Sequence, residues 1–213
     1  MKRFLLPFIL MASLSANASV FDGTYAGLSI HQGHIDSVDF DDGGETIMDW
    51  KPRDPEFGIG AVLGHRFYLT DTIGVAIETE YLRFKSFDVD GTAPLPMKNF
   101  FISSPLTLNM HGFGANIKPQ FYIGHSKFSI NPMVGAMHWR GKVTAEPNMF
   151  DHNEHVDKQH EWGVSYGLEV QYHADNSMSF AVGARQFKTK FDGDDYDMDI
   201  DITSLYANMN YYF

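Results

Sequence analysis

The chain has 213 residues, a length that suits one domain or two small ones. It contains no cysteine, and this excludes disulfide staples and thiol chemistry. Its formal net charge is −11, so the chain as a whole lacks the basic surface that nucleic-acid binding requires. Nucleic acid is therefore not expected among its partners.

The start of the chain has the three-part form of a secretory signal peptide. A basic start precedes an apolar run over residues 4–14, and this run is followed by the small-residue site Ala16-Asn17-Ala18. A membrane anchor is the less favoured alternative, because the run is too short to cross the hydrocarbon core as a helix. We expect residues 1–18 to be a signal peptide that is cleaved after Ala18, and residues 19–213 to form one domain.

Beyond this segment the chain shows no sustained helical period. Apolar residues instead alternate with small or polar ones in eight segments. In chain order these segments cover residues 26–30, 57–63, 75–81, 113–117, 128–139, 162–172, 180–184 and 205–213. The pattern predicts strands with an apolar face toward lipid and a small or polar face inward. In residues 128–139 both faces carry apolar residues, and we assign Ile130, Val134 and Ala136 to the outward face.

The connections between these strands alternate in length. Short connections are expected at residues 69–72, 124–127 and 174–177, and long ones at residues 33–56, 85–105, 141–161 and 188–201. In an up-and-down meander all the long connections then lie at one end, as in bacterial outer-membrane barrels with long extracellular loops. We therefore predict an all-β fold, an eight-stranded antiparallel up-and-down transmembrane barrel, because a closed barrel is the only non-helical structure that spans a membrane.

Acidic residues are concentrated in the predicted loops. The first, third and fourth long connections together hold 19 of the 27 acidic residues. The net charge thus belongs mostly to the extracellular end, where it suits a solvated surface as well as a binding role.

Two segments are out of phase with the strands beside them. Leu106, Leu108 and Met110 are even-numbered, whereas the lipid face that follows them is odd-numbered. Met198, Ile200 and Ile202 differ in the same way from the last strand. Either a one-residue bulge re-phases each strand, or these residues lie above the bilayer, where no lipid face is needed.

The last ten residues resemble the C-terminal signature of outer-membrane barrels, in which a terminal aromatic residue closes an alternating apolar strand. The residues that match are Leu205, Ala207, Met209, Tyr211 and Phe213. Residues 23–29, 58–67 and 74–81 also resemble the first three strands of the OmpA-like small outer-membrane barrels, and in particular their single-domain members. This resemblance implies an outer-membrane location, contact with outer-membrane lipids and lipopolysaccharide, and recognition of the C-terminal strand by the barrel-assembly machinery.

Charged residues on the predicted inward face are the candidate site residues. They are Arg66, Glu78, Glu80, Lys118, Glu169 and Arg185. Charges inside a low-dielectric barrel must pair, since an unpaired one costs several kcal/mol. The OmpA-like resemblance implies an interior network of this kind. It would act either as a salt-bridged plug or as a gate in a narrow water path, and the small interior of eight strands favours the plug.

Two predicted loops contain candidate metal ligands. One holds His152, His155 and His160, and the other holds Asp192, Asp194 and Asp197. The histidines lack the spacing of a zinc motif, and the aspartates lack the glycine and glutamate of a calcium loop. We therefore expect no metal and no cofactor, although the aspartates could share a cation with lipopolysaccharide phosphates.

The function expected is that of an integral outer-membrane barrel that presents four long, mostly acidic loops, in a structural or surface-interaction role. One alternative is a lipid A-modifying enzyme. It is disfavoured because His125-Ser126 lies in a predicted periplasmic turn and because His111 and His138 have no evident serine partner. The other alternative is a soluble, lipocalin-like binder. It is disfavoured because glycines would line its outer surface, whereas inside a barrel they leave room for long side chains. The ligand of the loops stays open.

Overall fold

The computed structural model describes residues 23–41, 46–52, 55–94, 101–124, 126–145, 155–175, 177–192 and 197–213. The described chain is all-β. Its strands are β1 (Thr24–Asp41), β2 (Thr46–Pro52), β3 (Glu56–Tyr68), β4 (Ile73–Phe84), β5 (Phe87–Pro94), β6 (Phe101–Tyr122), β7 (Phe128–Ala145), β8 (His155–His173), β9 (Met178–Asp192) and β10 (Asp197–Tyr212). No helix in these ranges is both long and apolar enough to cross a membrane.

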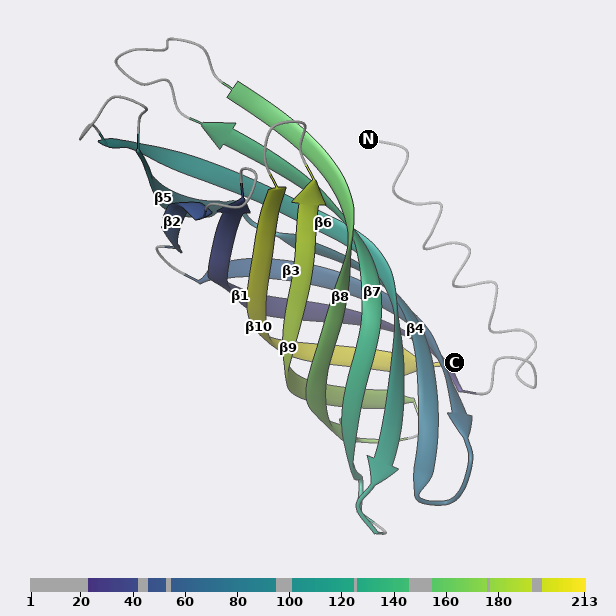
Figure 1. Cartoon of the computed structure of the whole chain (residues 1–213). Coiled ribbons are helices and arrows are strands. Elements are labelled where there is room, and N and C mark those ends of the chain that lie inside the picture. The colour runs from purple at the N-terminus through teal and green to yellow at the C-terminus, as the bar shows by residue number, and fades with distance from the viewer. Residues whose placement is uncertain are drawn as a thin grey trace, which may run out of the picture.

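Eight of these strands form a closed antiparallel barrel in the order β1, β3, β4, β6, β7, β8, β9, β10. The last strand closes the barrel on the first, with Tyr212 opposite Tyr25 and Leu205 opposite Gln32. The long, tilted strands of this barrel are visible in Figure 1. The predicted fold class is thus confirmed.

The outward face of the barrel is apolar and the inward face is mostly polar, as the alternation predicts. Leu28, Ile59 and Trp162 are each more than 60% exposed, while neighbours of opposite parity are buried. The ambiguous strand follows the predicted phase, since Ile130, Val134 and Ala136 are exposed. A lipocalin-like binder would have these faces reversed, so that alternative is wrong.

The strands of the barrel continue beyond its apolar belt. Where β3 and β4 end, β2 and β5 take their place: β2 pairs with β1 and β5, and β5 pairs with β6. Above the belt the strands form one sheet in the order β9, β10, β1, β2, β5, β6, β7, β8, and the described pairing between β8 and β9 ends where Gly163 lies opposite Thr189. In Figure 1, β2 and β5 lie at the end of the barrel where the longest strands project. We call this extension the rim.

The long connections were predicted as loops, but much of their length is strand. The β6 strand begins at Phe101, and β7 runs to Ala145. With 22 residues, β6 is twice as long as the roughly 9–11 residues that a tilted strand needs to cross a bilayer. The sequence pattern missed these extensions because no lipid face marks a strand above the membrane.

Of the two explanations for the out-of-phase segments, the bulge is not found in β6 or β10, whose described pairing with β7 and β9 keeps one register. Leu108, Met110, Ile200 and Ile202 instead stay on the inward face and are buried. They lie toward the rim, where the lumen is apolar, so the change of phase marks a change in the interior. One register shift of this kind does occur, in β1 between Ile35 and Ser37.

Arginine in the middle of the lipid face should destabilise the barrel strongly. Leu168 lies mid-strand on β8 and is 52% exposed. We expect Leu168→Arg to lower the free energy of unfolding in lipid vesicles by about 2–4 kcal/mol. The control is His160→Arg, an exposed position on the same face of the same strand but above the belt, where about 0–1 kcal/mol is expected. Equal losses in urea unfolding would contradict the assigned lipid face. Gly167 is no control, because a Cβ there would lie 2.5 Å from the Ala184 carbonyl oxygen.

Candidate functional site in the barrel lumen

A layer of ionic side chains crosses the lumen on the side of the apolar belt nearer the short connections. Lys118 on β6 lies between two carboxylates: its Nζ is 2.7 Å from Oε1 of Glu78 on β4 and 3.2 Å from Oε1 of Glu169 on β8. Arg185 on β9 forms a second ion pair with Glu80 on β4. All five residues are at most 4% exposed. The structure therefore brings together five of the six residues that the sequence singled out.

Neutral side chains complete the hydrogen bonding of this layer. Tyr25 donates to Glu78, and Tyr206 donates to Glu169 over 3.1 Å. Asn116 donates to Glu80 through Nδ2 at 3.0 Å and accepts from Arg185 Nη2 at 2.7 Å. Asn116 thus connects both members of one ion pair. Buried charges are tolerated only when paired and hydrogen-bonded in this way.

The ionic layer holds three carboxylates and two cations. Lys118 can neutralise only one of the two glutamates that it contacts. The layer therefore carries one net negative formal charge when all five residues are ionised. Glu78, one of the two glutamates, also accepts a hydrogen bond from Tyr25. Sequence parity could place these residues on the inward face, but it could not say which acid shares which base.

Arg66 lies apart from this layer, at the mouth of the barrel beside the short connections. Its guanidinium stacks over the rings of Tyr68 and Tyr212, with its central carbon 4.6 Å and 4.2 Å from their centroids. It also lies 3.4 Å from Nδ1 of His173, and no described carboxylate is within ion-pair distance. Arg66, Tyr68 and His173 line an open pocket of about 400 Å³. Cation–π contacts thus take the place of the ion pair expected for Arg66.

Close by, the β8–β9 turn is held by Asp175. The backbone amides of Ser177 and Met178 donate to its carboxylate at 2.8 and 2.7 Å. The hydrogen bond from Ser177 contributes most to keeping the pKa of Asp175 below its usual value. These hydrogen bonds tie the end of β8 to the start of β9.

An apolar layer fills the lumen on the rim side of the charges. Trp139 is fully buried at its centre, with its ring 5.3 Å from that of Phe187 and 6.3 Å from that of Phe84. The remaining members are Ile35, Leu82, Phe87, Leu108, Met110, Met137, Ile200 and Ile202. Sequence reasoning missed this layer, although the out-of-phase residues of β6 and β10 were its signal.

Glycines leave room for the large side chains of both layers, as the sequence predicted. A Cβ on Gly64 would lie 2.5 Å from the Tyr25 ring, and one on Gly58 would lie 2.8 Å from the Phe84 ring. His31 was not singled out by the sequence. It bridges the two layers: its ring stacks on that of Tyr206 at 5.2 Å and meets that of Phe84 edge to face at 6.1 Å.

The candidate metal ligands are only partly within the described structure. His160 is exposed on the outer wall of β8, 6.0 Å from the His138 ring. The other five, His152, His155, Asp192, Asp194 and Asp197, lie outside the residues whose side chains are described. Among those that are described, no three histidines or acids come close enough to hold a metal ion.

The C-terminal residues of the predicted assembly signal share the outer face of β10. Leu205, Met209 and Tyr211 are exposed there, and the Tyr211 and Phe213 rings meet edge to face at 5.7 Å. The backbone amide of Phe213 donates to Thr24 on β1 over 3.0 Å, so the terminal residue lies at the seam that closes the barrel.

The histidines considered for catalysis do not gather around a serine in the described chain. His125 lies outside the described residues, and the Ser126 hydroxyl accepts from the amide of Phe128 in the periplasmic turn. His111 and His138 are at the opposite end, on the outer wall; His138 lies 5.2 Å from the Trp162 ring and His111 lies 6.3 Å from that of Tyr81.

Comparisons with solved structures give further examples of this fold. The attachment invasion locus protein Ail of Yersinia pestis, solved with a heparin analogue, is 14% identical, with a TM-score of 0.45 over 89% of this chain and 99% of Ail. OprG of Pseudomonas aeruginosa is 13% identical, with a TM-score of 0.48 over 90% and 96%. The outer membrane protease OmpT of Escherichia coli is 8% identical, with a TM-score of 0.55 over 91% and 97%. At such identities the likeness concerns the fold alone.

A search of curated proteins finds no match. Residues 4–213 match the family model described as "Outer membrane protein beta-barrel domain". This match takes in nearly the whole sequence, and the closed eight-stranded barrel with an apolar outer face is the fold that it requires. The chain belongs to the outer membrane protein beta-barrel domain family.

Proposed function

We propose that this protein is a non-conducting, non-catalytic outer-membrane barrel whose work is done by the rim that it holds above the membrane. The observation that carries the proposal is the filling of the lumen. Two successive layers cross it, one of ion pairs and one of aromatic and aliphatic side chains, and their members are almost wholly buried. A plug of this kind favours a structural role over a gated water path.

The rim supports a role in surface interaction. Its strands form one continuous sheet, because β2 and β5 replace β3 and β4 above the belt and join β1 to β6. A sheet of paired strands holds its connections in fixed positions, as rigid scaffolds do for binding loops. Acidic residues are frequent in the rim sequence, so its ligand would have a neutral or basic contact surface.

The same proposal includes the maturation of the chain. Residues 1–18 would be removed on export, and the assembly machinery would read Leu205, Ala207, Met209, Tyr211 and Phe213. The exposure of Leu205, Met209 and Tyr211 on one face of the last strand supports this reading.

The conductance of the refolded protein tests the plug. In planar bilayers the folded chain should give no stepwise current above the lipid background. Folding is checked in the same sample by the difference in gel mobility between boiled and unboiled protein. Reproducible channel steps from fully folded protein would overturn the non-conducting role and favour the gate.

The orientation of the rim can be tested by single-cysteine labelling, which is clean because the chain has no cysteine. Asp88 on β5 and Asp71 in the β3–β4 turn are both exposed, at opposite ends of the barrel. On intact cells a membrane-impermeant maleimide should label Asp88→Cys and leave Asp71→Cys unlabelled. After the outer membrane is permeabilised, both should react. Labelling of only Asp71→Cys on intact cells would mean that the rim faces the periplasm.

A further inference from the structure

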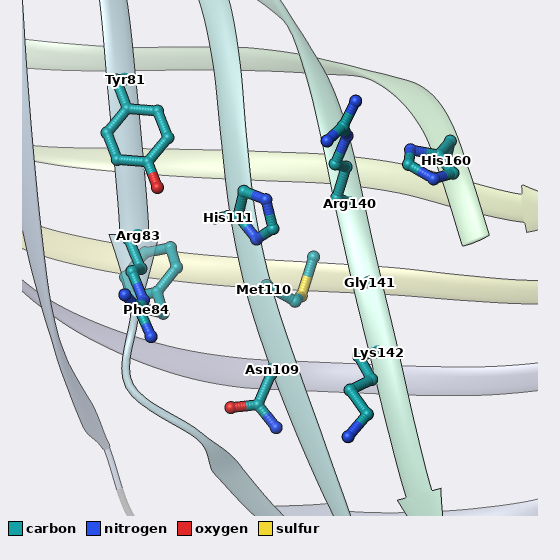
Figure 2. A pocket seen from close by; sticks show the side chains of 10 residues that line it. All are labelled: Tyr81, Arg83, Phe84, Asn109, Met110, His111, Arg140, Gly141, Lys142 and His160. Carbon is teal, nitrogen blue, oxygen red and sulfur yellow. The ribbon is translucent and has the colours of Figure 1, made fainter. Parts of the chain in front are cut away.

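A row of basic and imidazole side chains crosses the outer wall of the barrel. Arg83 on β4 pairs in register with His111 on β6, His111 with Arg140 on β7, and Arg140 with His160 on β8. All four lie on the outward face of their strands, whose inward neighbours Phe84, Met110 and Gly141 are buried. Figure 2 shows the four side chains side by side across these strands. We call them the basic row.

The row of side chains next to the basic row indicates where the basic row lies relative to the membrane. One pairing step closer to the membrane centre, Tyr81 pairs with Phe113, Phe113 with His138, and His138 with Trp162. Tyrosine and tryptophan concentrate where the hydrocarbon meets the lipid headgroups. The basic row is therefore the first outward row above the hydrocarbon. It lies at the rim end, which faces the outer leaflet.

A pocket lies behind this row, where β6 changes partner. His111 pairs with Arg83 on β4, but Leu108 already pairs with Phe87 on β5. Between these pairs the wall opens into a pocket of about 630 Å³, which is lined by the basic row together with Tyr81, Asn109 and Lys142 among others. Lys142 pairs with Asn109 and adds a third permanent cation one row higher.

These cations have no acidic partners in the part of the chain that the structure describes. No ion pair joins Arg83, Arg140 or Lys142 to any described carboxylate. On β9, outside the pocket, exposed Lys188 by contrast pairs with Asp201 at 2.6 Å. The chain has 27 acidic and 16 basic residues. Even so, the three cations and two histidines at this pocket have no counter-charge among the described side chains.

We propose that this pocket binds a phosphate group of an outer-leaflet glycolipid, which in the outer membrane is the lipid A part of lipopolysaccharide. Arginine suits such a ligand, because its planar fork donates two parallel hydrogen bonds to a phosphate. His111, between the two arginines, donates a further hydrogen bond, and Lys142 contributes charge from above. The acyl chains then lie along the apolar belt directly below. This site rests on the outward orientation of the rim proposed above, but not on what the rim binds or on whether the lumen conducts.

Binding of defined lipids to the folded full-length mature chain tests the site. The probes are bisphosphorylated lipid A, the same lipid with both phosphates removed, and inorganic phosphate alone. Each is titrated into protein in detergent micelles, and bound ligand is counted by native mass spectrometry. The gel-mobility shift checks that each variant is folded.

We expect Arg83→Gln with Arg140→Gln to weaken the binding of bisphosphorylated lipid A by about tenfold or more, the effect of losing one or two charge-assisted hydrogen bonds. The matched control is Lys188→Gln, which removes an exposed, ion-paired cation that does not line the pocket and should leave affinity within about twofold. Arg83→Lys with Arg140→Lys should keep the positive charge but lose the two parallel hydrogen bonds of each guanidinium group. We expect an affinity for lipid A between those of the wild type and the double glutamine variant.

Three outcomes would overturn the proposal. The first is equal affinity for lipid A in the double glutamine variant and in the wild type. The second is equally tight binding of the dephosphorylated lipid, which would assign the attraction to the acyl chains alone. The third is equally tight binding of inorganic phosphate, which would make the pocket a site for free anions and not for a lipid.

Discussion

Replacing Lys118 with Met should lower the free energy of unfolding by about 3–5 kcal/mol, the cost of leaving buried charge without its partner. Lys118 is 2% exposed and is the only described cation within ion-pair distance of Glu78 and Glu169. Without it both carboxylates lie in a low-dielectric lumen with no described cation within ion-pair distance. The loss would be read from the urea midpoint of folding in lipid vesicles.

Glu78→Gln is the matched control for this substitution. It leaves the ion pair of Lys118 with Glu169 intact, and the glutamine carbonyl can still accept from Tyr25. Because the layer has one carboxylate in excess, this variant should cost much less than Lys118→Met. If the two variants lose the same stability, Lys118 and Glu78 act as an isolated pair, and the shared arrangement around Lys118 is wrong.

Most of what the sequence could predict follows from the alternation of inward and outward side chains along each strand. A side chain on a strand can face only lipid or lumen, so one clear strand such as β8 fixes the direction of Leu168 and Glu169 alike. The alternation of short and long connections then gives the number of strands in the barrel. Both inferences need only local patterns, and both are confirmed, whereas the extracellular side of the long connections stays a prediction.

The missed features depend on contacts between distant segments. The strand extensions above the belt have no lipid face, so nothing in their alternation distinguishes them from loops. That β2 and β5 continue the sheet beyond β3 and β4 follows from pairing partners that the sequence does not reveal. Arg66 faces the lumen like the residues of the charged layer. It lies near the end of β3, however, and is therefore beside tyrosines at the mouth of the barrel.

The basic row shows the same limit most clearly. Arg83, His111, Arg140 and His160 come from four strands and are ordinary surface residues when each is considered alone. Only the register of β4, β6, β7 and β8 places them in one line. A sequence of net charge −11 therefore hides a local cationic surface, because total charge carries no information about position.

Trp139→Ala should be the most damaging change in the apolar layer, with a loss of about 3–5 kcal/mol in the free energy of unfolding. The Trp139 ring packs between Phe84 and Phe187, and Gly112 gives it room, since a Cβ there would lie 2.7 Å from the ring. Removing it leaves a cavity that the surrounding closed sheet cannot collapse to fill.

Trp139→Phe is the control, because it keeps most of the apolar volume. It also removes an indole N–H that has no hydrogen-bond partner in the described structure. Losing this unsatisfied group stabilises the fold and offsets part of the lost packing energy. The loss in the free energy of unfolding should therefore be well below that of Trp139→Ala. Both variants should stay silent in planar bilayers, because the ion-paired layer below still closes the lumen. Stepwise current through Trp139→Ala would instead make the apolar layer the seal, and the ionic layer a water-permeable lining.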